Sequence, residues 1–174
     1  MIELRDKPFE GCKSVSLPSM PILYYKPEKH KSLFGEFETS PSSGDLMHRY
    51  FISDGDAIYG YYSGLTALNN IHGTTQVPAI IELTTNNIDK DINYNINSTR
   101  YNVYKSDKEI NKQNHFYLEI LDTIERYYDY FEEDIVKCIK WVVIELKLNE
   151  QGFLELINDY SDRTKEVIEN VFRR

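Results

Sequence analysis

The apolar residues of the C-terminal third recur at helical spacing, and this pattern constrains the fold more than any other feature of the chain. From about Asn114 they lie three or four positions apart, which places them on one face of successive helices. Four segments follow this pattern: Tyr117 to Phe131, Ile135 to Leu146 after Asp134, Phe153 to Tyr160, and Val167 to Phe172 after a cap at Ser161 or Asp162. The sequence therefore predicts a helical bundle over residues 107–174.

The preceding part of the chain alternates between short strands and short helices. Runs of β-branched and aromatic residues predict strands at Ile22–Tyr25, Ala57–Tyr62, Val77–Thr85 and Thr99–Lys105. Pro78 should lie at the first residue of its strand or on an edge, because proline cannot donate to the ladder. Serine caps predict helices over residues 43–51 and 63–73. We expect an α+β fold: an irregular N-terminal arm over 1–21, a small, mainly antiparallel sheet with short helices over 22–106, and the bundle packed on it.

The segment from Tyr59 to Pro78 carries the most information about a possible site. Ser63 can cap its helix, and Gly73 can supply the left-handed residue that ends the helix. The polar residues that follow, with Asn69 nearby, could present hydrogen-bonding groups at the mouth of the next strand: Thr74, Thr75 and Gln76. The structural alternative is that they satisfy backbone groups left open at the helix end.

Charge and composition limit the classes of partner. The chain has 20 Lys and Arg residues against 28 Asp and Glu residues, a net charge of −8. DNA binding draws its affinity from cationic side chains, so DNA is disfavoured as a partner. No apolar run approaches the ~20 residues that span a bilayer, and the first ten residues lack the apolar stretch of a signal peptide. Cys12 and Cys138 lie far apart, so we expect no disulfide framework, no zinc site and a cytoplasmic location.

Support for catalysis is limited to one charged triplet. Glu145 and Lys147 match the acidic-x-Lys element of a metal-dependent nuclease, with Asp134 as a candidate upstream carboxylate. That chemistry needs Glu145 and Lys147 on one face, as on a strand, whereas the apolar period here is helical. The acidic residues at 119, 122, 125 and 132–134 are expected to face solvent. The histidines lack metal-ligand spacing and no glycine-rich phosphate loop is present, so we expect neither a metal nor a cofactor.

Two stretches resemble a known family. SGLTALNN at residues 63–70, followed by TTQVP at 74–78 and TTNN at 84–87, is similar to the C-terminal domain of AbiE-type abortive-infection antitoxins and related transcriptional regulators. LYYKP at 23–27 and FGE at 34–36 resemble the stretch that follows the winged helix in that family. The resemblance covers roughly residues 22–172, and its specific motif lies at 60–78.

This resemblance implies a non-enzymatic antitoxin. The protein would counteract a nucleotidyltransferase-like toxin encoded beside it, as a functional partner without a tight complex. Only about 22 residues precede the YYKP stretch, so we expect no DNA-reading winged helix and no autorepression by this chain. The candidate recognition or structural residues are Ser63, Asn69, Thr74, Thr75 and Gln76, with no catalytic residue among them.

Two function classes stay open on these grounds. The first is a regulatory or interaction protein of a toxin–antitoxin or phage-defence locus. The second is a metal-dependent nuclease that uses Glu145 and Lys147. A strand at 141–147 would favour the nuclease, and a helix there would favour the first class.

Overall fold

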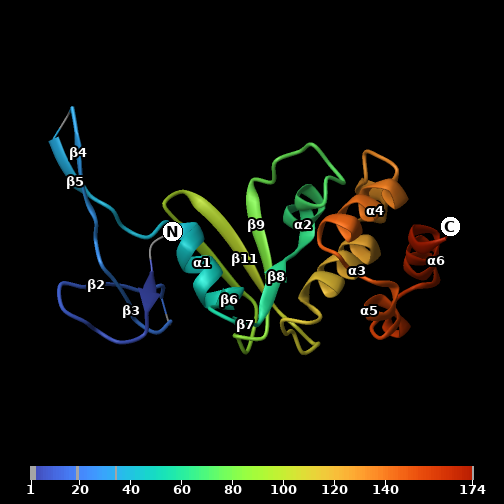
Figure 1. Cartoon of the computed structure of the whole chain (residues 1–174), viewed down its shortest axis with the longest axis horizontal. Helices are drawn as coiled ribbons and strands as arrows, with labels where there is room; N and C mark the ends of the chain where they lie inside the picture. Colours follow the sequence, from blue (N-terminus) through green and yellow to red (C-terminus); the bar gives the residue numbers. More distant parts are fainter. Residues whose placement is uncertain (1–2, 19, 34, 174) are drawn as a thin grey trace. The chain divides into compact units, whose positions relative to one another are not determined.

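The computed structural model describes residues 3–18, 20–33 and 35–173 (Figure 1). The chain divides into two compact units between Tyr50 and Phe51. Short strands and most of one helix form the first unit, and a mixed sheet followed by helices forms the second.

The first unit contains two small antiparallel sheets. Strand β3 (Leu23–Tyr25) lies between β1 (Leu4–Arg5) and β2 (Lys13–Val15), and β4 (Lys29–Ser32) pairs with β5 (Gly35–Glu38) as a hairpin. The sequence predicted β3, but it predicted irregular structure for the segments that form β1 and β2. Strands of two or three residues are too short for an alternating pattern to be recognised.

Helix α1 (Ser43–Phe51) begins where the serine cap predicted. The Ser42 hydroxyl accepts the backbone N–H of Asp45 at 3.0 Å, and the Asp45 carboxylate accepts the backbone N–H of Ser42 at 2.9 Å. This reciprocal arrangement satisfies N–H groups that no helical carbonyl can reach.

The second unit is built on a four-stranded sheet in the order β10-β11-β9-β8. Its strands are β8 (Gly60–Tyr62), β9 (Ile80–Thr85), β10 (Ile92–Ile96) and β11 (Thr99–Lys105), preceded by a hairpin of β6 (Ser53–Asp54) and β7 (Ala57–Ile58). The central pair, β9 and β11, is parallel, whereas β8 with β9 and β10 with β11 are antiparallel. The predicted α+β class with a small, mainly antiparallel sheet is confirmed.

Three strands of this sheet differ from the prediction. The single strand predicted at Ala57–Tyr62 is divided into β7 and β8. Strand β9 begins at Ile80 rather than Val77, so Pro78 precedes the strand instead of starting it. Strand β10 was not predicted, because its alternating residues are asparagines rather than the charged or β-branched residues typical of a strand. Asn97 and Ser98, between β10 and β11, both have positive φ, at 50° and 67°. They form the two-residue turn that matches the twist of a hairpin.

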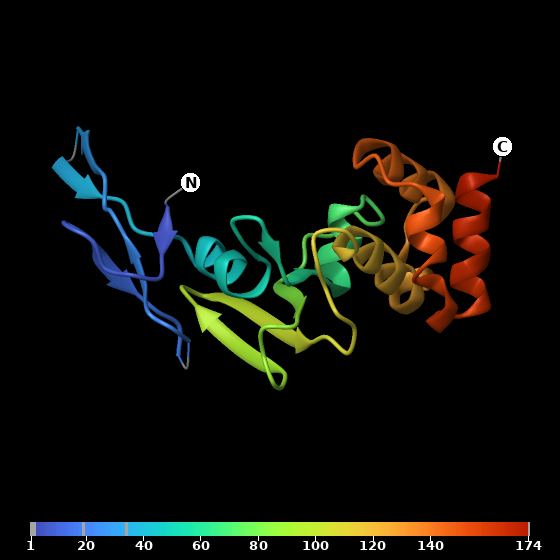
Figure 2. The same ribbon diagram turned by 60° about the horizontal axis from the view of Figure 1, so that its bottom comes forward.

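Helix α3 (His115–Tyr127) is central to the second unit. It packs against β8 and α2 (Gly64–Asn70) on one side and against α5 (Glu150–Leu154) and α6 (Asp162–Phe172) on the other (Figures 1 and 2). The 3-10 helix η1 (Tyr128–Tyr130) extends α3, and α4 (Ile135–Glu145) packs on α6. Because α3 is covered on several sides, most of its residues from Tyr117 to Ile124 are buried.

Of the four helices predicted from the apolar pattern after Asn114, all but the third are confirmed. Asp134 caps α4 by accepting the backbone N–H of Lys137, and Ser161 caps α6 by accepting that of Thr164. The apolar pattern at 153–160 forms α5 followed by the 3-10 helix η2 (Ile157–Asp159) instead of one helix. The core around these helices includes Leu121, Ile124, Ile139, Phe153 and Ile168. Within the described residues, no helix has the length and apolarity needed to cross a membrane.

We expect Ser98→Gly to stabilise the protein. Ser98 has φ of 67°, a conformation that is unfavourable for a residue with a Cβ atom, and Asn-Gly is the preferred pair for this turn. The free energy of unfolding should rise by about 0.5–1 kcal/mol, as measured by urea denaturation. Ser98→Ala keeps the Cβ atom and is the matched control. A gain in the alanine variant as large as that in the glycine variant would contradict this explanation.

Candidate functional site

The N-terminus of α2 is capped by a residue far away in the sequence. The Glu82 carboxylate accepts the backbone N–H of Leu65 at 2.9 Å, and the phenol of Tyr104 donates to the other Glu82 oxygen at 3.1 Å. Gly64 has φ of 60°, and a Cβ atom there would lie 1.9 Å from a Glu82 carboxylate oxygen. Glycine at position 64 is therefore what allows Glu82 to reach the helix.

The predicted cap by the Ser63 side chain is wrong. Ser63 occupies the N-cap position, but its side chain makes no capping hydrogen bond. Its hydroxyl is buried and has no hydrogen-bond partner among the residues that the structure describes. Glu82 takes over the role because a carboxylate on β9 already faces the first turn of α2.

The predicted end of α2 also needs correction. His72, not Gly73, has the left-handed backbone conformation, with φ of 59°. Gly73 is required for packing instead: a Cβ atom there would lie 2.4 Å from the Leu68 side chain and 2.9 Å from the Phe131 ring. The carbonyl of Gly73 also accepts the backbone N–H of Glu132 at 2.8 Å.

The residues after Gly73 surround one carboxylate. We call residues 74–78 the TTQ loop. The Thr74 hydroxyl donates to one oxygen of Glu132 at 2.7 Å, and the backbone N–H and hydroxyl of Thr75 both donate to the other at 2.8 Å. The Gln76 amide adds a longer bond of 3.3 Å. Four hydrogen bonds from three consecutive residues thus fix the loop to the segment that precedes α4.

Asn69 holds the same loop from the α2 side. Its side-chain amide donates to the carbonyls of Thr74 and Gln76, at 3.2 and 3.1 Å. The structure therefore brings together four of the five predicted site residues. Ser63 lies at the opposite end of α2 and does not join them.

The fixed loop borders a small hollow. Its volume is about 170 Å³, and its lining includes Leu65, Pro78 and Tyr130 together with Thr74, Gln76 and Val77. The Val77 side chain is 85% exposed. A rigid loop with an exposed apolar side chain beside a hollow suits a contact with another molecule, because little conformational entropy would be lost on binding.

The loop changes the electrostatics of Glu132. The backbone N–H of Thr75, followed by the two threonine hydroxyls, lowers the pKa of Glu132 to about 2. Glu132 was expected to face solvent as part of an acidic surface. It is exposed, but its carboxylate is the acceptor that organises the TTQ loop.

The acidic residues of α3 were also expected to face solvent, and this is wrong. Asp122 accepts the phenols of Tyr61 from β8 and Tyr160 from the C-terminal region, at 2.5 and 2.7 Å. Burial, reinforced by the Asp122 charge, raises the pKa of both tyrosines far above its usual value. Glu125 binds the start of α6 through Ser161 and Thr164, and Glu119 is buried. These acids face neighbouring elements because α3 is covered on several sides.

The residues of the nuclease alternative do not adopt the geometry that it needs. Glu145 ends α4, so the segment is a helix rather than a strand, and Lys147 lies beyond it with φ of 54°. Asp134 caps the other end of α4, roughly 16 Å away at 1.5 Å per residue. Within the described residues, no group of three or more His, Cys, Asp or Glu side chains is arranged to hold a metal ion.

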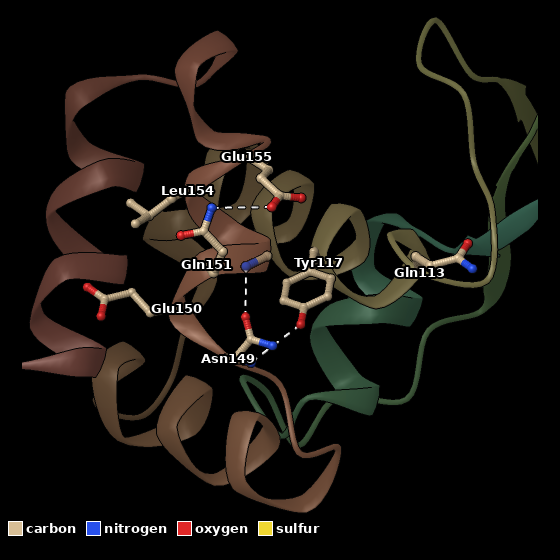
Figure 3. Close-up of a pocket in the computed structure, with 8 residues that line it drawn as sticks. Gln113, Tyr117, Asn149, Glu150, Gln151, Leu154 and Glu155 are labelled. Atoms are coloured by element: carbon tan, nitrogen blue, oxygen red, sulfur yellow. Dashed lines mark hydrogen bonds between the residues drawn. The ribbon is translucent and has the colours of Figure 1, made fainter.

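A wider depression lies where α5 meets the start of α3 (Figure 3). Its volume is about 610 Å³, and its lining includes Gln113, Tyr117, Asn149, Gln151 and Glu155. Three hydrogen bonds join residues of its lining: the backbone N–H of Asn149 donates to the Tyr117 hydroxyl, the backbone N–H of Gly152 donates to the Asn149 side chain, and the Gln151 amide donates to Glu155. These bonds maintain the α5 turn and give the depression no evident chemistry.

Sequence reasoning missed Glu82 and Glu132. They lie 17 and 57 residues from their partners Leu65 and Thr75, so no local spacing connects them. The only available signal for Glu132 was its position in the acidic group at 132–134, ahead of a helix. The hydrogen-bonding residues of the TTQ loop were recognisable, but the shared acceptor was not.

We expect Ser63→Ala to leave the free energy of unfolding unchanged or to raise it by up to about 1 kcal/mol. The substitution removes a buried hydroxyl that has no partner, whereas loss of a true serine cap would lower stability by about 1 kcal/mol. Urea denaturation distinguishes the two. Ser161→Ala, which removes a side-chain cap from α6, is the matched control and should be destabilising.

Glu132 should make the protein sensitive to acid. Its pKa is lowered in the folded state, so its contribution to stability is present above the unfolded value near 4.5 and is lost as the pH falls toward 2. Glu132→Gln should remove this part of the acid sensitivity and lower stability at pH 7. Denaturation measured between pH 2 and 7 tests this, with Glu133→Gln as the control. Equal acid sensitivity in the wild type and Glu132→Gln would contradict the assignment.

Comparison of the chain with protein-family models, with curated proteins and with solved structures gives no significant match. The resemblance to AbiE-type antitoxins therefore rests on the residues themselves.

Proposed function

We propose that this chain is a non-enzymatic, antitoxin-like regulatory protein of a toxin–antitoxin or phage-defence locus. It counteracts a nucleotidyltransferase-like toxin in the cytoplasm, and the TTQ loop is the surface that its partner recognises. The observation that carries the proposal is the binding of Thr74, Thr75 and Gln76 to the single carboxylate of Glu132. These three residues belong to the specific motif at 60–78 that resembles the antitoxins, and their hydrogen bonds fix the conformation of the loop.

The surface of the loop supports recognition rather than catalysis. Val77 is an exposed aliphatic residue on a loop held from two sides, by Glu132 and by Asn69. The hydrogen bonds of the loop are directed onto Glu132, and the aliphatic side chain of Val77 stays exposed beside them. One exposed aliphatic residue beside a small hollow suits a small, transient contact, in keeping with a functional partner that forms no tight complex.

Growth rescue in cells that express the toxin tests this function. The probe is the nucleotidyltransferase-like reading frame next to the gene for this chain, expressed alone and together with the chain. We expect toxin expression to reduce colony counts and co-expression to restore them. Failure of soluble, folded chain to restore growth would contradict the proposal.

Variants of the loop test where recognition occurs. Val77→Asp places a charge on the exposed face and should weaken recognition by about 2 kcal/mol, roughly thirtyfold, so rescue is lost. Ile144→Asp is the matched control, because Ile144 is 77% exposed but lies on α4, outside the loop. Rescue that survives Val77→Asp would place recognition elsewhere on the surface.

A further inference from the structure

A third pocket lies between β8, the end of α2, α3 and α4. Its volume is about 240 Å³, and it shares no lining residue with the hollow beside the TTQ loop. Its polar and aromatic lining residues are Tyr62, Asn70, Phe116, Glu119, Trp141 and Glu145. The pocket contains two carboxylates and three aromatic rings, and none of the described residues that line it is Lys, Arg or His.

Glu119 is the unusual member of this lining. Glu119 is only 8% exposed, yet its carboxyl group accepts no hydrogen bond from any residue that the structure describes. The next two acids along α3 differ, since Asp122 and Glu125 each accept two or more hydrogen bonds. Burial of most of this side chain without a hydrogen-bond donor disfavours its charged form. A cation in the pocket would supply a partner for that form.

The aromatic rings place this cation in a suitable environment. Phe116 lies three residues before Glu119 on α3, and Trp141 lies four residues before Glu145 on α4, so each ring shares a helix face with a carboxylate. Trp141 is 49% exposed, and the His72 ring packs edge-on against it with centroids 4.6 Å apart. The faces of aromatic rings attract organic cations.

The size and ligands of the pocket favour an organic cation over a metal ion. Among the described residues no group of three or more His, Cys, Asp or Glu side chains is arranged to hold a metal ion, and this pocket has only two carboxylates. Its volume lies below the 300–1,000 Å³ typical of sites for drug-sized ligands, so it suits a head group with a short chain. The net charge of −8 adds a field that attracts cations.

We propose that this pocket binds an alkylammonium group, with Glu119 as its ionic partner and Phe116 and Trp141 as its aromatic walls. The group comes either from a free amine or from a lysine side chain of another protein. The proposal does not depend on the antitoxin function, because it concerns different residues.

Burial raises the pKa of Glu119 to about 8, so this carboxyl carries its proton at pH 7 while the pocket is empty. Binding of an alkylammonium releases that proton, and affinity therefore increases as the pH rises from 6 to 9, where the ligand itself stays charged. The other titratable groups around Glu119 are Tyr62 on β8, Glu145 on α4, His115 on α3 and, against Trp141, His72.

Fluorescence provides a direct measurement, since Trp141 is the single tryptophan of the chain. We expect n-butylammonium chloride to change the fluorescence of the full chain in a saturable way, with a dissociation constant on the order of 1 mM. Butanol at the same concentrations, a neutral analogue, should produce no saturable change. An equal response to butanol, or no saturable response to butylammonium, would overturn the proposal.

Substitutions test the assigned roles. Glu119→Gln has the same shape as the protonated acid, so the fold should be retained, and binding should weaken about tenfold or more and lose its pH dependence. Phe116→Leu keeps the fluorophore and should weaken binding several-fold through loss of one wall. Glu166→Gln on α6 replaces an exposed carboxylate that does not line the pocket and should bind like the wild type. Unchanged binding in both Glu119→Gln and Phe116→Leu would refute the site.

The same assay distinguishes the two possible sources of the ammonium group. Lysine blocked as an N-acetyl methylamide represents a lysine side chain in a protein, and butylammonium represents a free amine. Binding of the blocked lysine at least as tightly as butylammonium supports a protein partner, and binding of butylammonium alone supports a small amine. Absence of binding by both overturns the proposal.

Discussion

Carboxylates that accept hydrogen bonds from distant segments determine how the second unit is assembled. Glu82 on β9 caps α2, and Glu132 holds the TTQ loop that follows α2. Asp122 on α3 joins β8 to the C-terminal region, and Glu125 receives the start of α6. Each of these acids accepts hydrogen bonds from another segment, and charge-assisted bonds of this kind are stronger than neutral ones. A high acidic content is therefore partly a structural requirement here, not only a property of the surface.

The helices were predictable where one local signal sufficed. In α4 the helical period and the cap at Asp134 agree, and β11 was predicted over its full range. The short strands β1 and β2 were missed because their stability comes from pairing with β3, a tertiary contact with no local pattern. The prediction of one helix at 153–160 was wrong for another reason. The apolar residues there belong to two short helices, α5 and η2, and the break between the two helices does not disturb the apolar period.

The candidate site was predictable from its donors but not from its acceptor. Threonine and glutamine residues that follow a helix carry side-chain donors that need hydrogen-bond acceptors. Thr74, Thr75 and Gln76 make such bonds. Glu132 comes from far along the chain, and only the folded structure identifies it. The error at Ser63 has the same origin, because Glu82 arrives from another strand and takes the place of the local cap.

Paired and unpaired acids in one unit impose opposite pH dependences on stability. Glu132 has a lowered pKa, so its contribution is lost as the pH falls from about 4.5 toward 2. Glu119 has a pKa raised to about 8, so the folded state binds its proton more tightly than the unfolded chain, and stability decreases as the pH rises from about 4.5 to 8. Together, these two residues favour maximum folding stability at mildly acidic pH. A cation bound beside Glu119 would stabilise the charged carboxylate. It would therefore reduce the loss of folding stability as the pH rises toward 8.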